Sequence, residues 1–562
     1  MIKTDIETAI SDVLATLGAG EVTFTVEQPA DMVHGDYATN AALAAAKVLK
    51  KNPKDVAESL AKELEGKVAG VKKIEVAGVG FINFTISGMT IKDIVHEAQE
   101  AKWGSNELYK NKKVMVEYTD PNPFKEFHIG HLMSNAIGEA IARLLEAAGA
   151  QVTRANYQGD VGLHVAKEIR GMQIMIDKFP SEDSSSGEKA YFLGTCYQVG
   201  SKSYDSDPGF KQQVDDLNKI IYEHSDSEIN KLYDWGRKVS LEHFEELYKI
   251  LGTKFDKYFF ESESWPIGLE LVKKNIGKVF EESEGAVVYK GEQDGLHTRV
   301  FLTKAGLTTY EAKDLGLLKL KEETGDFDTS ITVTANEQKE YFKVVLAAAK
   351  KIDEVKDIAN KTMHVTHGMM RFANGKMSSR TGNVITGESL LSDLQEDAKA
   401  KMEGRSLPDA DKVAEQIAVS AVKYTVLKSG SGKDIVFDPE KSLSLEGDSG
   451  PYVQYALVRA RSLLRKAADA EVVQPEPSGP TPFERLIIHF PEVVAHAAVE
   501  LEPHYVVTYI TELAAAFNSW YASERFIVDG KITSRTVAVL KAVENTLAQG
   551  LKVLGIPAPQ EM

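Results

Sequence analysis

Two histidines near residue 130 are the side chains whose types and spacing most directly suggest chemistry. They belong to the segment Phe127-His128-Ile129-Gly130-His131, which lies between an expected strand and the start of an expected helix. Backbone N–H groups at a helix start favour an anion, and a glycine lets a nucleotide approach the backbone closely. Two imidazoles three residues apart can both donate hydrogen bonds to phosphate oxygens. His128, Gly130 and His131 therefore predict a phosphate site, although surface or capping histidines produce the same string.

The second candidate segment is GKMSSRTGN at residues 375–383, about 245 residues further along the chain. Lys376 would act as a point charge toward a triphosphate, and Ser378 and Ser379 would donate hydrogen bonds to it. The flanking glycines would allow the loop to close. Taken alone, the segment also fits an ordinary polar loop. Together with the first segment in one α/β body, however, it is much more specific for a triphosphate.

The elements that must position these residues read as a βαβ unit. Residues 114–119 alternate as a strand, residues 131–150 carry apolar residues at helical spacing up to Gly149, and residues 151–160 read as another strand. A strand–helix–strand order predicts a parallel sheet with right-handed crossovers.

No internal repeat of 20–50 residues is visible, and three domains are expected. The fold class is α/β: a doubly wound, Rossmann-like parallel-sheet catalytic domain with an insertion, an N-terminal α+β domain and a C-terminal all-α bundle. The expected bounds are 1–108, 109–388 with the insertion at about 168–290, and 389–562. Within these domains we expect helices at 40–51 and 55–67, a hairpin at 72–87, further strands at 286–290, 297–303 and 330–335, and a Pro-rich connection at 472–484.

The composition excludes several classes of protein. The chain has 562 residues with 66 Lys and Arg against 83 Asp and Glu, so a net charge of −17 argues against coating nucleic acid through a global positive field. A local basic surface remains compatible with this charge. The sequence contains no run of about 20 apolar residues, so a membrane-spanning helix is not expected. The acidic N-terminus does not resemble a signal peptide, so the cytoplasm is expected. The single cysteine, Cys196, permits no internal disulfide and no Cys-based zinc cluster.

The two segments together resemble the class I aminoacyl-tRNA synthetases, whose signatures are H-I-G-H and K-M-S-K-S. Further segments resemble the arginyl-tRNA synthetases: VEYTDPNPFKEFHIGHLMSNAIG, ANYQGDVGLH, HVTHGMMRFANGKMSSRTGN, PYVQYALVRARSLLRKA and LEPHYVVTYITELAAAFNSWYASE. GDYATNAA with GFINFTIS resembles that family's N-terminal domain, which contacts the tRNA elbow. The resemblance spans nearly the whole chain.

The resemblance implies a two-step reaction. L-Arginine and ATP, bound with Mg²⁺ as the substrate complex, give arginyl-adenylate, which the 2′-OH of the terminal adenosine of tRNA(Arg) then accepts. His128 and His131 would hold the α-phosphate side, Lys376 the leaving pyrophosphate, and Lys125 would assist. The resemblance implies no metal held by the protein, no prosthetic group, no membrane partner and a monomer.

The resemblance also implies the residues that bind arginine. Glu117, Asn122 and Gln338 would bind its α-amino end, while Glu261, Tyr310 and Asp314 would bind its side chain, because carboxylates and a phenol suit guanidinium donors. Taken singly, each of these residues also fits a solvated surface or a core position. The sequence departs from the family pattern at four positions: Asp120, where many members carry Ser; Lys313, where Arg is common; Lys376, which many arginyl enzymes lack; and Ser379, which stands in place of the signature's second lysine.

The helical C-terminal part resembles the family's anticodon-binding bundle. Arginines would contact phosphates there, and aromatic side chains would either stack on unpaired bases or pack in the core. The candidates are Arg459, Arg461, Arg465, Tyr452, Tyr455, Trp520 and Tyr521.

Two other functions are compatible with parts of the sequence. A metal-dependent hydrolase would use the imidazoles of two H-x-x-H pairs, His128 with His131 and His364 with His367, as zinc ligands. Both pairs lie beside phosphate-type loops, and the family resemblance accounts for both. The other alternative is a tRNA-binding relative without catalysis, but the intact Lys376, His128, His131 and Asn122 favour an enzyme.

Overall fold

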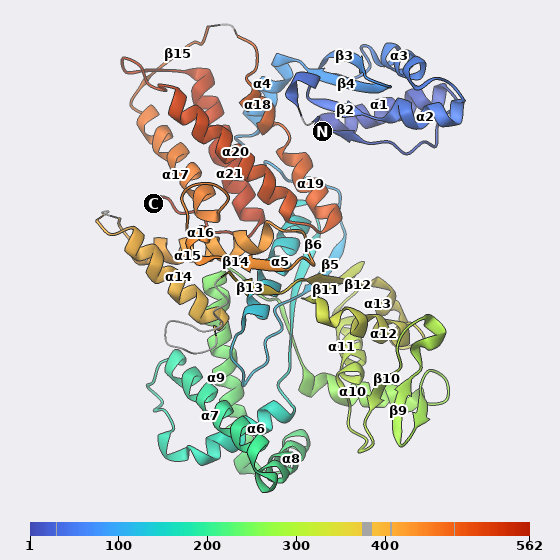
Figure 1. Ribbon diagram of the computed structural model, residues 1–562, viewed down its shortest axis with the longest axis vertical. Helices are drawn as coiled ribbons and strands as arrows, with labels where there is room; N and C mark the ends of the chain where they lie inside the picture. Colours follow the sequence, from blue (N-terminus) through green and yellow to red (C-terminus); the bar gives the residue numbers. More distant parts are fainter. Residues whose placement is uncertain (30, 374–384, 405–406, 477) are drawn as a thin grey trace. The chain divides into compact units, whose positions relative to one another are not determined.

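The computed structural model describes residues 1–29, 31–373, 385–404, 407–476 and 478–562. The chain forms two compact units, whose elements are labelled in Figure 1. The first unit contains residues 1–106, 453–499 and 508–550, and the second contains residues 107–452, 500–507 and 551–562. No helix in these described ranges is long and apolar enough to cross a membrane.

The second unit is built on a five-stranded parallel sheet in the order β12-β11-β5-β6-β7. The strands are β12 (Thr362–His367), β11 (Thr329–Ala335), β5 (Lys113–Glu117), β6 (Gln151–Gln158) and β7 (Lys257–Phe260). The order runs outward from β5 in both directions, so the strand order reverses beside this central strand. In open α/β sheets, ligands bind at such a point, outside the carboxyl ends of the strands. The predicted α/β fold is confirmed.

Helix α5 (Ile129–Ala147) follows β5 and is buried along most of its length. Its Ser134 hydroxyl donates to the carbonyl of Val333 in β11 at 2.9 Å and accepts the N–H of Thr119 at 3.0 Å. The helix ends as predicted, because Gly149 adopts a φ of +94° that suits glycine. These bonds hold the start of α5 at the carboxyl edge of β5 and β11.

The predicted strands at 286–290 and 297–303 form, but their assignment to the main sheet was wrong. β9 (Ala286–Tyr289) and β10 (Arg299–Leu302) join β8 (Glu281–Ser283) in a separate antiparallel sheet of order β10-β9-β8. The main sheet continues instead through β7, which lies inside the region expected to be inserted. β7 has four residues and passes directly into α10 (Glu261–Lys274), so it offers too little alternation to be recognised.

The chain between β6 and β7 folds into helices α6 (Leu163–Ile174), α7 (Ser186–Ser206), α8 (Pro208–Glu223) and α9 (Ser227–Leu251), which gather at one end of the second unit (Figure 1). They share an apolar core that includes Val165, Ile169 and Val214. The acidic, Ser-rich segment before α7 provides its N-cap, since Ser185 and Glu188 form a capping box.

The second unit contains further helices, a short two-stranded sheet and 3₁₀ turns. Their bounds are α11 (Tyr310–Thr324), α12 (Lys339–Ala349), α13 (Lys356–Lys361), α14 (Gly387–Lys401), α15 (Ala410–Leu427), α16 (Pro439–Ser442), β13 (Met370–Phe372) and β14 (Ile435–Phe437), with 3₁₀ turns η2 (Ile176–Lys178), η3 (Gly291–Asp294) and η4 (Asn336–Gln338).

The first unit begins with an α+β domain, as predicted. Its four-stranded sheet has the order β1-β2-β4-β3, and the predicted hairpin is the antiparallel pair β3 and β4. The elements are α1 (Ile2–Thr16), β1 (Val26–Glu27), η1 (Met32–His34), β2 (Tyr37–Thr39), α2 (Ala41–Leu49), α3 (Pro53–Leu64), β3 (Val71–Ala77), β4 (Phe81–Ile86) and α4 (Gly88–Glu97).

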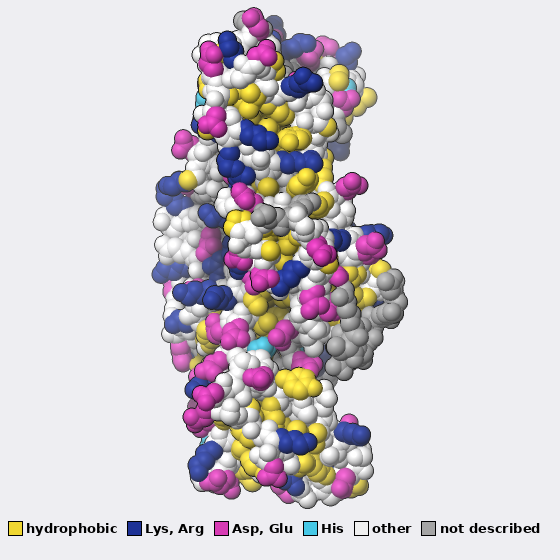
Figure 2. All heavy atoms as spheres, turned by 90° about the vertical axis from the view of Figure 1, so that its left-hand side faces the viewer, with side chains coloured by type: hydrophobic (Ala, Val, Ile, Leu, Met, Phe, Trp, Pro, Cys, Tyr) yellow, Lys and Arg dark blue, Asp and Glu magenta, His cyan; other side chains and the backbone are white. Residues whose placement is uncertain are grey.

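The C-terminal part is helical, as predicted, and most of it belongs to the first unit. Its elements are α17 (Gly450–Ala467), β15 (Glu471–Val473), α18 (Pro482–Ile487), α19 (Phe490–Glu500), α20 (His504–Ser523), β16 (Lys531–Thr533) and α21 (Ser534–Val553). Long-range bonds join it to the N-terminal domain within this unit: the Trp103 indole donates to Thr546 at 3.0 Å, and Arg485 pairs with Asp36. On the face shown in Figure 2, basic and acidic side chains are interspersed.

Candidate active site

The two histidines of the first segment meet at the start of α5. His128 is the N-cap of the helix, and its N–H donates to Nδ1 of His131 at 3.2 Å. The N–H of Gly130 donates to Nδ1 of His128 at 3.1 Å. The rings stack with their centroids 3.4 Å apart. Because Nδ1 of each neutral ring accepts a hydrogen bond, Nε2 of each ring carries the proton and can donate to a phosphate oxygen.

Both rings are held neutral. Burial lowers the pKa of His131 well below its usual value, and the neighbouring His128 and Lys125 lower it further. Burial and Lys125 also lower the pKa of His128. Burial raises the pKa of Glu261 above its usual value, and the charges of Lys313 and Lys125 act against that rise. Lys125 therefore provides the positive charge beside two neutral donors, within electrostatic reach of a residue predicted to bind arginine.

The second segment and the second histidine pair give different results. Lys376, Ser378 and Ser379 lie in 374–384, outside the described residues. His364 stacks on Phe342 at 4.1 Å, and His367 donates from Nδ1 to the Gly368 carbonyl at 2.8 Å. Within the described ranges, no group of three or more His, Cys, Asp or Glu could hold a metal ion. The described residues therefore contain no ligand set for the zinc site of a metal-dependent hydrolase.

Glu117 ends the central strand β5 inside the protein. Its Oε2 lies 2.9 Å from Nζ of Lys321 on α11, and both side chains are 2% exposed. Lys321 also donates to Thr332 of β11 at 3.2 Å. Lys321 was not among the residues predicted from the sequence to belong to the site. Its position could have been predicted from Asp314, because residues seven positions apart lie on the same face of a helix.

Asp314 lies in the same region and interacts with α12. Its Oδ2 accepts a hydrogen bond from the hydroxyl of Tyr341 at 2.6 Å. Burial raises the pKa of Asp314 to about 7, and the charges of Glu117 and Glu261 act in the same direction. The carboxyl predicted to face the guanidinium is thus half-protonated near neutral pH. Tyr341 is a partner that the sequence analysis missed.

Glu261 already has a cationic partner. Its Oε2 lies 2.6 Å from Nζ of Lys313, and both side chains are almost fully buried. Lys313 also lies over the ring of Tyr310, 5.2 Å from its centroid. Tyr310 itself is 64% exposed and lines a cavity of about 460 Å³ together with Tyr222 and Trp265. Tyr310 therefore lies in the wall of a cavity. The alternative prediction, that Tyr310 packs in the core, is wrong.

The loop after β6 brings Asn122 and Glu261 together. The N–H of Gly159 donates to Oδ1 of Asn122 at 3.2 Å. A Cβ atom at position 159 would overlap that oxygen and come within 3.3 Å of the carboxyl carbon of Glu261. The next residue, Asp160, is fully buried and accepts the N–H of Ser262 at 2.8 Å and Nε of Arg237 at 3.0 Å. Both residues were missed, although their place at the carboxyl end of a strand was a signal.

Gln338 is the last of the predicted arginine-binding residues. It is exposed and lies on η4, which directly follows β11. β11 pairs with β5 so that Thr332 lies opposite Glu117. Gln338 therefore lies beyond the carboxyl end of a strand that neighbours β5, at the edge where the other candidate residues gather.

Three of the candidate tRNA-binding residues gather on the helices of the first unit. The guanidinium of Arg459 lies between the rings of Tyr455 and Tyr521, 4.2 Å and 5.0 Å from their centroids. It also donates to Asn518 at 2.8 Å. This alternation of two aromatic rings and one cation suits stacked bases and a phosphate. Of the other candidates in this part, Arg461 pairs with Glu544 at 2.8 Å and Arg465 is exposed.

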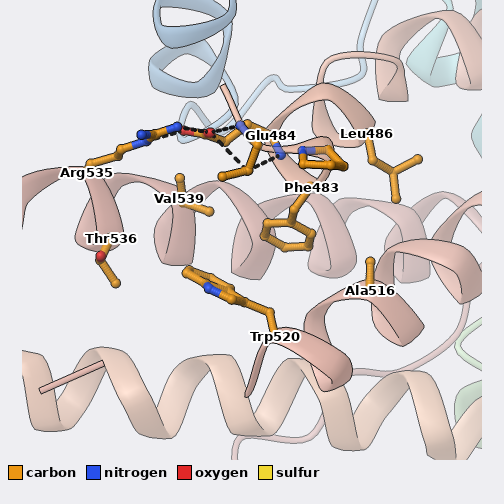
Figure 3. A pocket seen from close by; sticks show the side chains of 10 residues that line it. Phe483, Glu484, Leu486, Ala516, Trp520, Arg535, Thr536 and Val539 are labelled. Atoms are coloured by element: carbon orange, nitrogen blue, oxygen red, sulfur yellow. Dashed lines mark hydrogen bonds and ion pairs between the residues drawn. The ribbon is translucent and has the colours of Figure 1, made fainter. Parts of the chain in front are cut away.

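Trp520 faces a different environment. It lines a cavity of about 520 Å³, where its ring centroid lies 5.2 Å from that of Phe483 (Figure 3). The ion pair of Arg535 and Glu484 closes one side of this cavity. Tyr452 lies in the first turn of α17, where its N–H donates to Ser449 Oγ at 3.1 Å. The structure therefore does not group Trp520 with Tyr455 and Tyr521.

The parallel sheet, its switch point at β5 and the paired imidazole donors at the start of α5 define a class I aminoacyl-tRNA synthetase. Comparison with known families agrees. Residues 91–439 match the family described as tRNA synthetases class I (R), catalytic domain. Residues 1–86 match the arginyl tRNA synthetase N terminal domain, and residues 453–562 match the DALR anticodon binding domain. The chain belongs to the arginyl-tRNA synthetase family.

Individual relatives extend the match along the chain. An arginine–tRNA ligase of Latilactobacillus sakei is 30% identical, over 100% of both chains. One of Ligilactobacillus salivarius is 31% identical, over 97% of both chains. Among solved structures, the arginyl-tRNA synthetase of Thermus thermophilus superposes with a TM-score of 0.79 at 25% identity and covers 100% of both chains.

Proposed function

We propose that the chain activates L-arginine with ATP to arginyl-adenylate and transfers the arginyl group to the 2′-OH of the terminal adenosine of tRNA(Arg), releasing AMP and pyrophosphate. The observation that carries this proposal is the cluster of the carboxyl groups of Glu117, Asp314 and Glu261, which act on one another electrostatically, in the same sheet domain as the paired donors of His128 and His131 at the start of α5. A cationic amino acid and a phosphate chain would thus be held side by side. We also infer that the enzyme acts as a monomer in the cytoplasm.

In the first step, the arginine carboxylate attacks the α-phosphate of ATP, and negative charge grows on the phosphate oxygens. Donors preorganised around those oxygens stabilise such a transition state. Nε2–H of His128 and of His131 would supply two of them, and Lys125 the positive charge. Mg²⁺ bound to the ATP substrate would neutralise phosphate charge. By its place in the signature, Lys376 would bind the leaving pyrophosphate, with Ser378 and Ser379 as further donors.

The amino acid would lie along the carboxyl edge of β5 and β11. Asp314 would receive the guanidinium, with Tyr310 closing the cavity beside it. Asn122 and Gln338 would hold the α-amino end. Glu117, which is paired with Lys321, would act mainly through its charge. A pocket that fixes both ends of arginine supplies the orientation that the attack on phosphorus requires.

In the second step, the helical part would position the tRNA. Arg459, Tyr455 and Tyr521 would take unpaired bases and a phosphate, with Arg461 and Arg465 as further phosphate contacts. The match to an anticodon-binding domain supports this placement. Tyr452 and Trp520 remain candidates, with Trp520 in a separate cavity.

ATP–pyrophosphate exchange tests the proposal when it is measured with each of the twenty amino acids, with and without tRNA(Arg). We expect exchange with arginine alone among the amino acids, and with tRNA present. Charging of tRNA(Arg) with arginine completes the test. Exchange with another amino acid, or none with arginine and tRNA together, would contradict the proposal.

A further inference from the structure

The start of α14 is fixed to the histidine segment that precedes α5. Thr386, the N-cap of α14, forms an isolated antiparallel bridge with His128. The N–H of Gly387 donates to the carbonyl of Phe127 at 2.8 Å. A Cβ atom at position 387 would come within 2.9 Å of the Phe127 ring, so a larger residue there would displace that ring. The start of α14 therefore helps to fix the backbone of His128.

Helix α9 contacts this junction through two neighbouring residues. Phe244 is 2% exposed, and its ring centroid lies 6.3 Å from that of Phe127. Phe127 in turn packs against the ring of His131, with the centroids 5.4 Å apart. His243 donates from Nε2 to Oε2 of Glu388 at 2.9 Å. Adjacent residues of α9 thus contact both the histidine segment and the start of α14.

The ring of His243 carries a proton on Nε2 in either charge state, because the carboxylate of Glu388 can only accept a hydrogen bond. Nδ1 is buried without a hydrogen-bond partner among the described residues, and the carboxylate of Glu246 lies 3.9 Å from it. Burial lowers the pKa of His243, but the hydrogen bond and charge of Glu388 and the charge of Glu246 together raise it above its usual value. A charged ring makes the stronger bond to Glu388.

Glu388 has a second ionisable neighbour, which makes the bond from His243 more important. Burial raises the pKa of Glu126, and the charge of Glu388 raises it further. Glu126 lies two residues before His128, so repulsion between the two carboxyl groups acts on the junction between α14 and the histidine segment. The charged groups around the bond are thus Glu246 on α9, Glu388 on α14 and Glu126 before α5. His243 opposes the repulsion among them.

We propose that His243 is a positioning residue which, through Glu388 and the start of α14, fixes the backbone of His128 so that its imidazole donates to the α-phosphate of ATP. This inference rests on the proposed function and adds a residue outside both signature segments. His243 itself would contact no substrate. Its effect is on a preorganised donor, and such donors act on the transition state more than on substrate binding.

ATP–pyrophosphate exchange with arginine and tRNA(Arg), measured on the full chain, tests this role. We expect His243→Ala to lower kcat about 5- to 20-fold and to change the KM for arginine less than about twofold, because a misplaced donor acts on the transition state. Adding Glu388→Ala should cause no further loss, since both changes remove the same bond. Lys238→Ala is the matched control. It breaks an exposed ion pair with Glu242 on the same helix and should leave kcat unchanged.

The dependence on pH separates this role from a purely structural one. His243→Gln keeps an N–H donor for Glu388 but has no positive charge. Because the pKa of His243 is raised, its charge is present at low pH and is lost as the pH rises through that pKa. The ratio of wild-type kcat to His243→Gln kcat should therefore fall toward one between about pH 6 and about pH 8.5. Titration of His128 and His131 cancels in this ratio, because both proteins contain them. If His243→Ala does not fold, as judged by circular dichroism, this ratio decides the question by itself.

The outcomes separate the inference from the proposed function. A kcat loss below about twofold in His243→Ala, or a further loss when Glu388→Ala is added, would overturn the role of His243 while wild-type exchange with arginine stays intact. An equal loss in Lys238→Ala, or a His243→Gln ratio that does not change with pH, would overturn it as well. A wild-type protein that shows no exchange with arginine and tRNA(Arg) would instead overturn the proposed function.

Discussion

Glu117 at the end of β5 and Lys321 on α11 form an ion pair of 2.9 Å in which both side chains are 2% exposed. The two residues lie 204 positions apart in the sequence and meet because β5 and β11 are neighbours in the sheet. Burying both charges is costly, so the pair contributes less to stability than to placement. It neutralises the Glu117 carboxylate, whereas Asp314 has no ion-pair partner among the described residues and accepts a hydrogen bond from Tyr341.

Lys321→Met should therefore destabilise the protein by about 3–5 kcal/mol, because it leaves the Glu117 carboxylate buried without a partner. Adding Glu117→Gln should restore most of the stability without restoring arginine charging. Chemical denaturation and steady-state charging measure the two effects. Lys343→Met is the matched control, since Lys343 pairs with Glu340 at the surface and should leave stability unchanged. Full recovery of charging in the double variant would contradict a functional role for Glu117.

Asp314→Asn should lower kcat/KM for arginine roughly 10²–10³-fold, because an amide replaces one guanidinium acceptor with a donor. The pH dependence follows from the raised pKa of about 7. Only the ionised carboxyl pairs with a guanidinium, so kcat/KM should rise as the pH increases through that value. Tyr341→Phe removes a hydrogen bond that lowers the pKa of Asp314, and should shift the rise to higher pH.

The pH profile of kcat/KM in tRNA charging measures these effects, with circular dichroism as the folding control. A loss below threefold for Asp314→Asn would show that Asp314 does not bind the substrate. If the pH profile of Tyr341→Phe coincides with that of the wild type, the rise in kcat/KM with pH reflects the ionisation of a group other than Asp314.

Gly159→Ala should impair arginine binding without unfolding the protein. Its added methyl group would overlap Oδ1 of Asn122 and crowd the Glu261 carboxyl group, so both residues would have to move. Displacements of this size typically cost about 10²-fold in rate. Gly187→Ala is the matched control, because a Cβ there meets no atom within 4 Å. Steady-state kinetics for arginine should show a raised KM in the first variant and wild-type values in the second.

The sequence predicted contacts between residues that are close together in the chain, but not contacts between residues that are far apart in it. The imidazole pair was predicted from one strand–helix junction, where His128 and His131 are neighbours by local geometry alone. The pairing of Glu261 with Lys313 could not be predicted in that way. It requires β7 to lie beside β6 and α10 to pack on α11, and β7 itself was too short to recognise.

The same limit applied to partners that modify a predicted residue. Asp314 was a candidate from its segment, but its hydroxyl partner Tyr341 comes from another helix. Gly159 and Asp160 carried a usable signal, because small and acidic residues at the carboxyl end of a parallel strand lie where ligands bind. The roles of all these residues remain predictions until variants are measured.

Glu168 on α6 provides a test of stability away from the pocket. It is fully buried among apolar side chains that include Val165 and Ile169, and neither carboxyl oxygen has a hydrogen-bond partner in the described ranges. Burial raises its pKa well above the usual 4.5. An unsatisfied buried polar group costs about 1–3 kcal/mol. Glu168→Met, which is similar in size and apolar, should therefore stabilise helices α6–α9.

The gain from Glu168→Met should depend on pH, with a sign that follows from the raised pKa. Above pH 4.5 the unfolded state ionises Glu168 while the folded state keeps it protonated. The wild-type penalty therefore grows as the pH rises, so the advantage of Glu168→Met should be larger at pH 8 than at pH 5. Hydrogen exchange of the backbone amides in α6–α9 measures this difference. Glu242→Met, on the exposed side of α9, should show no such gain. Faster exchange in Glu168→Met at both pH values would instead mean that the carboxyl group supports the fold.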